Sequence, residues 1–138
     1  MNKLTPAQNK TIEEYWININ DYRQKLKFRE WELTENKSID ENIGGGKSNR
    51  ISDTTGNKAM ILTQDDQYQH YKKIINAIEK TYANVDLDMQ TIVNMRYWDK
   101  DGVWEWEDIA DKLYISRSKV LRKRNLLIDK TAERLGWM

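Results

Sequence analysis

The sequence contains no cysteine, one proline, one phenylalanine and a single histidine among its 138 residues. The lack of cysteine excludes disulfides and zinc–thiolate sites, and it fits a reducing compartment. The histidine, His70, is set among polar residues, and no paired acidic motif with a companion lysine accompanies it. We therefore expect neither an enzyme such as a nuclease nor a protein that holds a cofactor or a metal.

Long apolar runs are also missing. No run approaches the roughly 18 residues that a membrane-spanning helix needs, and no signal peptide opens the chain. We therefore expect a soluble cytoplasmic protein with no membrane partner.

Charged residues make up 33% of the chain and hydrophobic residues 38%, so the core must be compact. Six tryptophans and seven tyrosines are present, and each aromatic side chain can bury a large area. The net charge is only +1, which provides no overall basic field. Any affinity for nucleic acid must therefore come from local clustering of charge.

Residues 106–128 are typical of a helix-turn-helix, in which the second helix enters the DNA major groove. The apolar spacing predicts a first helix over 106–113, with the small Ala110 where the two helices cross. Ser116 is expected to cap the second helix, and Val120 to face inward. The turn position that usually holds glycine is Tyr114. Either the turn is of a different type, or a strained positive φ is tolerated there.

The second helix carries five cations before its first acidic residue, Asp129. At about 100° per residue, one face points away from Val120 and Leu127. The residues expected to contact bases from this face are Ser118, Lys119, Arg122 and Asn125. Arg122 is expected to bind a guanine and Asn125 an adenine. The alternative is a basic amphipathic helix whose charges are merely solvated.

The remaining cations of this helix lie off that face. Arg117 and Lys123 are expected to hold DNA phosphates, which sets register without reading sequence. Arg124 falls on the apolar side, so its stem is expected to pack while its guanidinium reaches out.

At the N-terminus, Thr5, Pro6 and Gln8 form a predicted capping box that opens one helix running to about Leu33. This helix, over residues 1–33, has an apolar heptad stripe. The stripe consists of Ile12, Ile19, Leu26 and Leu33, with Tyr15 and Tyr22 between them. It can pair with a second copy, giving a homodimer, or lie against the same chain. The length of the helix in so small a protein favours pairing.

Residues 34–57 are polar, contain four glycines and are expected to form a linker. Lys47 and Arg50 are expected to follow a DNA backbone, or to belong to a solvated tether. Gly46-Lys47-Ser48 is not a phosphate loop, because Glu41 stands where the first glycine belongs and no strand precedes it.

Residues 58–138 are expected to form a helical domain, which makes the fold all-α. One helix is predicted from Lys58 or Gln64 to Ala83, and another after Asp86 or Asp88. Residues 99–102 are expected to form a turn rather than a calcium loop. Trp104 and Trp106 are expected to roof the helix-turn-helix, and Gly136 to end the last helix.

Residues 86–98 and 104–128 resemble the C-terminal DNA-binding region of bacterial sigma factors. Most of the chain also resembles the RinA and ArpU group, small transcriptional activators of phages of Gram-positive bacteria. The matching segments are Tyr15-Trp16, Asn42-Ile43-Gly44-Gly45-Gly46-Lys47-Ser48, Arg96-Tyr97-Trp98 and 106–116. This resemblance implies activation of late phage genes for packaging and virion structure, by binding double-stranded DNA near a promoter in the host cytoplasm. Tyr114 departs from the sigma-like turn.

Two other functions fit the same pattern. A small terminase subunit also combines a helix-turn-helix with a helical assembly region, and a mass near eight or more subunits would favour it. A sigma-like module that acts mainly through RNA polymerase would bind the polymerase in the absence of DNA.

Overall fold

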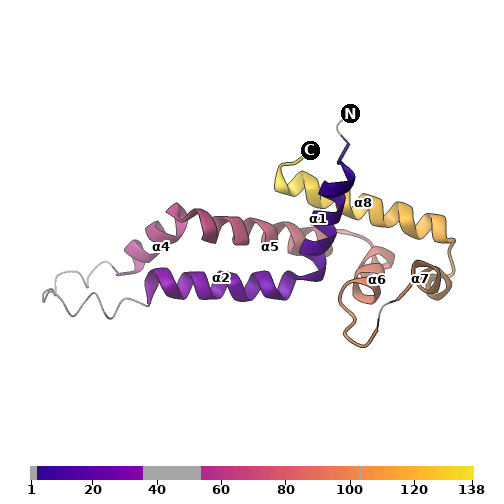
Figure 1. The fold of residues 1–138 in the computed structure, drawn as a ribbon, viewed down its shortest axis with the longest axis horizontal. Coiled ribbons are helices and arrows are strands. Elements are labelled where there is room, and N and C mark those ends of the chain that lie inside the picture. Colours follow the sequence, from indigo (N-terminus) through magenta and orange to yellow (C-terminus); the bar gives the residue numbers. More distant parts are fainter. Residues whose placement is uncertain (1–2, 36–53, 103) are drawn as a thin grey trace, which may run out of the picture. The chain divides into compact units, whose positions relative to one another are not determined.

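The computed structural model describes residues 3–35, 54–102 and 104–138, and every regular element in these parts is a helix (Figure 1). This confirms the all-α prediction for the described chain. Lys47, Arg50 and most of the predicted linker lie outside the described residues. No helix in the described parts is long and apolar enough to cross a membrane. The helices are α1 (Pro6–Ile17), α2 (Ile19–Thr34), α4 (Thr54–Gln64), α5 (Asp66–Asn84), α6 (Leu87–Arg96), α7 (Trp106–Leu113) and α8 (Arg117–Leu135).

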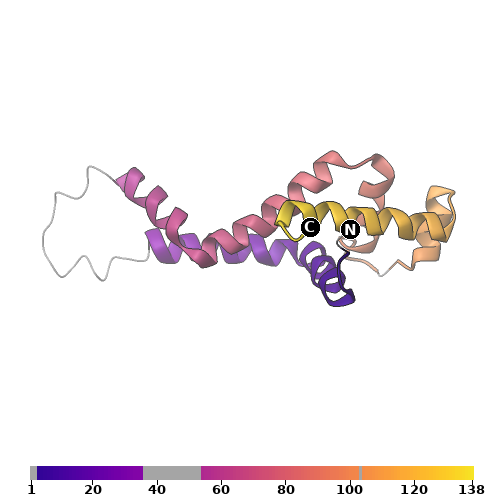
Figure 2. The same cartoon turned by 90° about the horizontal axis from the view of Figure 1, so that it is seen from above.

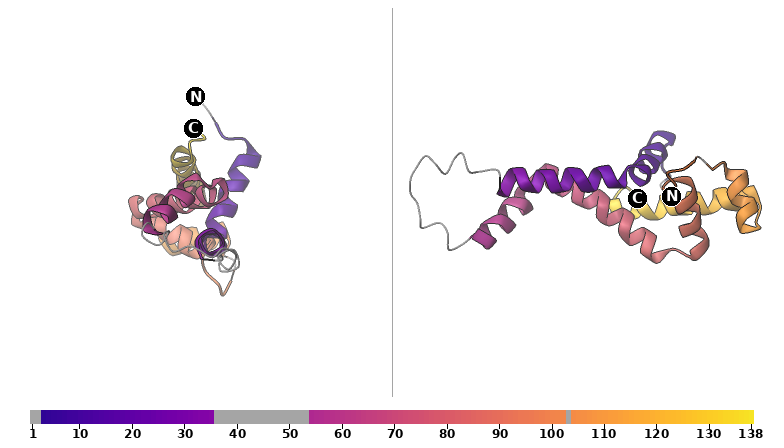
Figure 3. Two further views of the ribbon diagram at one scale, coloured as in Figure 1. Left: turned by 90° about the vertical axis from the view of Figure 1, so that its left-hand side faces the viewer. Right: turned by 90° about the horizontal axis from the view of Figure 1, so that it is seen from below.

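The chain forms two compact units. One comprises residues 1–19 and 76–138, and the other comprises residues 20–75. This division differs from the predicted boundaries at 33 and 58, because α1 packs with the C-terminal helices. Within the second unit, α2 runs beside the first part of α5 (Figures 1 and 3).

The predicted capping box of α1 is present: Thr5 Oγ1 accepts from the Gln8 N–H, and Gln8 Oε1 accepts from the Thr5 N–H. The prediction of one helix from Pro6 to Leu33 is wrong. The helix ends at Ile17, and α2 begins after Asn18, whose φ is −103° and ψ 24°. Asparagine is a weak helix former because its side chain competes for backbone hydrogen bonds. The heptad pattern runs through this position and conceals the break.

The heptad stripe is divided by this break. Ile12 and Ile19 are buried within the chain, at 0% and 2% exposure, while Leu26 and Leu33 are half-buried. Packing against the same chain, the second of the two alternatives, therefore holds for Ile12 and Ile19.

Of the two starts predicted for the next helix, Gln64 is close, because α5 runs from Asp66 to Asn84, whereas Lys58 lies in a separate helix, α4. Helix α4 begins earlier, at Thr54, and Asp65 separates it from α5. The Asp65 carboxylate accepts the Tyr68 N–H at 2.8 Å, which caps the first turn of α5. The Arg29 guanidinium donates to both of its oxygens, at 2.7 and 3.0 Å. This hydrogen bonding from Arg29, followed by that from Tyr68, lowers the pKa of Asp65.

In the first unit, Asp86 rather than Asp88 caps α6, and it accepts the Met89 N–H at 2.8 Å. Helices α6, α7 and α8 pack on one another around a small apolar cluster. The buried members of the cluster are Ile92, Ile109, Ala110 and Val120. Trp104 and Trp106 are partly buried against it, as predicted. Residues 100–101 form a turn, in which Asp99 Oδ1 accepts the Asp101 N–H at 2.8 Å.

Candidate nucleic-acid interface

Helices α7 and α8 are joined by a turn of very few residues, and α7 lies beside the N-terminal end of α8 (Figures 2 and 3). Helix α7 has the predicted bounds. Its capping residue, Tyr114, has φ 59° and ψ 41°, which is the left-handed conformation. The Ile115 N–H then closes the turn on the Ala110 carbonyl at 3.1 Å. The strained form of the turn is therefore the one adopted, and the Tyr114 side chain is 94% exposed.

Ser116 starts α8 as predicted, because its Oγ accepts the Lys119 N–H at 3.1 Å. One turn later, Val120 is fully buried in the cluster that contains Ile109 and Ala110. The start of α8 is thus held by a cap on its exposed side and by packing on its buried side. These two constraints fix both where the helix begins and which face it turns outward.

The opposite face of α8 is exposed along the N-terminal half of the helix. None of the three exposed cations in this half of the helix, Arg117, Lys119 and Arg122, forms an ion pair with another described residue. The N-terminal end of the helix dipole adds to their positive potential. The exposed polar residues of this half are Arg117, Ser118, Lys119, Arg122 and Asn125, and we call them the α8 cationic face. The structure thus brings together all four predicted base contacts and Arg117.

Lys123 differs from these residues. Its Nζ lies 3.2 Å from Asp86 Oδ2, and its side chain is 19% exposed. The backbone hydrogen bond from Met89, together with Lys123, lowers the pKa of Asp86 below its ordinary value of 3.8. Lys123 therefore links α8 to the start of α6, and its charge is already compensated within the unit.

Arg124 points into the unit, so the prediction that its guanidinium reaches out is wrong. Its Nη1 donates to Glu13 Oε2 at 3.1 Å, and the guanidinium lies 5.3 Å from the centre of the Trp106 ring. The Tyr97 hydroxyl donates to the same oxygen of Glu13. Burial raises the pKa of Tyr97, and the neighbouring Glu13 carboxylate raises it further. The acidic partner comes from α1, which the local pattern of α8 does not reveal.

Trp16 anchors α1 to the rest of this unit and is fully buried. Its Nε1 donates to Thr131 Oγ1 at 3.1 Å, and its backbone carbonyl accepts from Trp98 Nε1 at 2.8 Å. Sequence reasoning did not assign this role. Its signal was the spacing of Ile12, Trp16 and Ile19, which places all three on one helical face.

No curated protein and no solved structure matches the chain. One family model does match, over residues 9–133, and it covers both compact units. The chain therefore belongs to the family described as "Protein of unknown function (DUF722)".

Proposed function

We propose that this protein is a sequence-specific DNA-binding activator of transcription, in which α7 and α8 act as a helix-turn-helix. One observation carries the proposal. The N-terminal half of α8 exposes three uncompensated cations, of which Lys119 and Arg122 lie on the side away from the fully buried Val120. A helix held in this way presents charge without having to rearrange on binding, which limits the entropic cost of association.

Within this proposal, the residues of the α8 cationic face divide by chemistry. Arg122 donates two hydrogen bonds to a guanine edge and Asn125 pairs with an adenine, while Ser118 and Lys119 complete the base-reading surface. Arg117, at the start of the helix, holds a phosphate. We assign Lys123 to the ion pair with Asp86 and not to DNA. If Lys123 bound a phosphate instead, Asp86, which caps α6, would lose its positively charged partner.

Tyr114 is a further residue of this surface. In the sequence it is notable only because it departs from the sigma-like turn. It lies three residues before Arg117, the first residue of the α8 cationic face, and its exposed ring leaves the hydroxyl available to donate to a phosphate oxygen. A strained tyrosine with a solvent-exposed ring does little for the isolated fold. We propose that it contacts the DNA backbone.

The resemblance to the sigma-factor region and to the RinA and ArpU group supports the proposed role in activating transcription. A protein of this kind binds near a promoter, and RNA polymerase is its proposed second partner. The proposed targets are the late genes of a phage.

The test begins with selection of duplexes from a random library by the full chain, followed by fluorescence anisotropy on a selected and a scrambled duplex. Arg122→Ala should weaken binding to the selected duplex by about 1–3 kcal/mol and relax preference at one position. Arg117→Ala should weaken binding to both duplexes alike and reduce the salt slope by about one.

Lys130→Ala is the matched control, because Lys130 is an exposed cation in the C-terminal half of the same helix. It should leave binding to both duplexes unchanged. Failure to enrich any duplex would refute the proposed function. Equal losses from the Arg122 and Lys130 variants would refute the assigned surface.

A further inference from the structure

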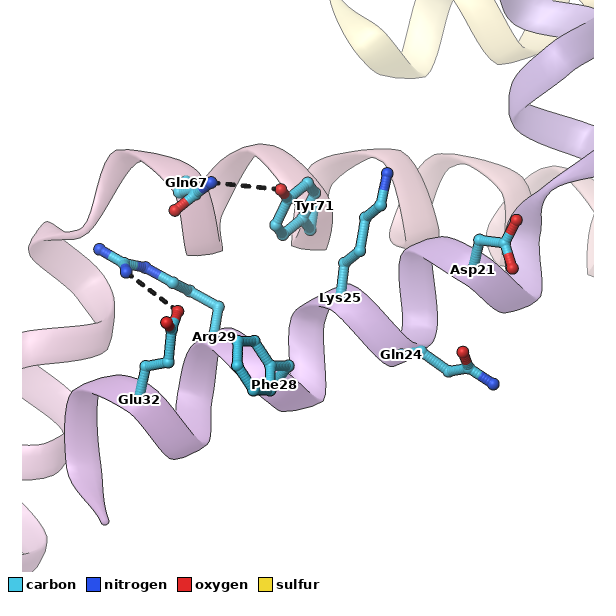
Figure 4. Close-up of a pocket in the computed structure, with 8 residues that line it drawn as sticks. All are labelled: Asp21, Gln24, Lys25, Phe28, Arg29, Glu32, Gln67 and Tyr71. Atoms are coloured by element: carbon cyan, nitrogen blue, oxygen red, sulfur yellow. Dashed lines mark hydrogen bonds and ion pairs between the residues drawn. The ribbon is translucent and has the colours of Figure 1, made fainter. Parts of the chain in front are cut away.

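Helix α2 presents two large aromatic side chains to solvent. Phe28 is 57% exposed and Trp31 is 45% exposed, and their ring centres lie 5.6 Å apart. Beside Phe28 lies an open cleft of about 630 Å³ between α2 and α5 (Figure 4). Adjacent exposed rings next to a hollow are typical of a surface that is covered by a partner.

The charged residues around these rings form pairs of opposite sign at equal distances from one point on the helix. The segment from Lys25 to Glu32 reads KLKFREWE, and its midpoint falls between Phe28 and Arg29. Lys27 and Glu30 stand equally far from that midpoint on opposite sides, and so do Lys25 and Glu32. Apart from Arg29, whose charge is compensated by Asp65, the charges in one half of the segment are therefore opposite to those at matching positions in the other half.

The structure places one of these pairs on the same flank of α2. Lys25 and Glu32 are two helical turns apart, and both line the cleft beside Phe28 (Figure 4). A two-fold axis perpendicular to α2 generates a second copy of the helix that runs antiparallel to the first. Each flank of α2 then lies next to the corresponding flank of the second copy. In such an isologous contact, Lys25 of each copy meets Glu32 of the other.

The four charged side chains of these two pairs can still form ion pairs with a second molecule. Neither Lys27 nor Glu30 forms an ion pair with another described residue. Among the described residues, the Lys25 ammonium contacts the Tyr22 ring, 5.1 Å from its centre, and forms no ion pair. Glu32 accepts from Arg29 at 3.2 Å through one oxygen and keeps 37% of its side chain exposed.

We propose that two copies of this chain pair antiparallel through the outer face of α2, with the midpoint of residues 25–32 on the two-fold axis. Phe28 and Trp31 form the apolar centre of the contact. On its two flanks, Lys25 and Lys27 of each copy face Glu32 and Glu30 of the other. This surface differs from the heptad stripe, of which Ile12 and Ile19 are buried within the chain.

Sedimentation velocity of the full chain without DNA tests the pairing and does not depend on the proposed function. The native chain should sediment at twice 16.5 kDa. Lys25→Glu with Lys27→Glu makes all four charges acidic, and Glu30→Lys with Glu32→Lys makes all four basic. Each double variant alone should self-associate about tenfold more weakly or worse, because like charges then oppose each other.

Mixing the two double variants in equal amounts should restore the dimer, which also shows that both are folded. Lys73→Glu, the reversal of an exposed lysine on α5, is the matched control and should leave the dimer intact. A monomeric native chain, charge variants that dimerise as before, or a mixture that stays monomeric would each overturn the proposal.

The orientation is tested with a spin label on Asn20→Cys, since the native chain has no cysteine. The antiparallel arrangement places the two labels about 17 residues apart along the helix axis, which is about 26 Å. A parallel pair brings them to roughly the interaxial distance of 10 Å. The longer separation supports the proposal, and the shorter one overturns it.

Discussion

Replacing Tyr114 by glycine should raise the stability of the free protein while it weakens DNA binding. Tyr114 is the only described non-glycine residue with positive φ. Its 94% exposed side chain means that almost no packing inside the chain is lost by removing it. The substitution therefore isolates the cost of the backbone conformation from any contact made by the ring.

The magnitude follows from two opposing contributions. The left-handed conformation costs a residue other than glycine about 1–2 kcal/mol. Glycine loses more conformational freedom on folding, which offsets about 0.5–1 kcal/mol. The net gain in the free energy of unfolding is therefore about 0.5–1 kcal/mol. In a unit of this size, that corresponds to a rise in melting temperature of about 2–8 °C.

Thermal unfolding followed by circular dichroism measures the stability change, and anisotropy on a selected duplex measures binding by the same samples. Tyr114→Phe separates the two effects, because it keeps the ring and the strain and removes only the hydroxyl. It should melt like the native chain and still bind DNA more weakly. A lower melting temperature for Tyr114→Gly would show that the strain argument is mistaken, and unchanged binding would remove Tyr114 from the interface.

Two further predictions concern stability. Trp16→Phe should lower the free energy of unfolding by about 2 kcal/mol, because it shrinks a fully buried side chain and removes the donor to Thr131, and urea titration measures this loss. Asp86→Ala should cost about 0.5–2 kcal/mol at neutral pH, because α6 loses its cap. Since the folded pKa of Asp86 is lowered, its contribution is complete above its ordinary value of 3.8 and disappears as pH falls through the folded value. Urea titrations of the native and Asp86→Ala chains should therefore converge in strong acid, and a constant difference at all pH values would contradict this assignment.

Local patterns predicted the helices wherever the determining interactions are close in sequence. The bounds of α7, the Ser116 cap and the capping box of α1 each depend on residues within a few positions of one another. The inward direction of Val120 followed from helical periodicity alone. The same periodicity concealed the end of α1, because the apolar heptad spacing continues from Ile12 to Ile19 across the break at Asn18.

The amino-acid sequence by itself determined the all-α class of the described chain and which face of α8 carries its exposed cations, because helical periodicity depends only on neighbouring residues. Tertiary structure alone decided what happens to the other cations. Glu13 reaches Arg124 across 111 positions, and Asp86 reaches Lys123 across 37, so neither charge is left for another partner. No local pattern carries that information, because the energy of an ion pair depends on distance in space and not on separation along the chain.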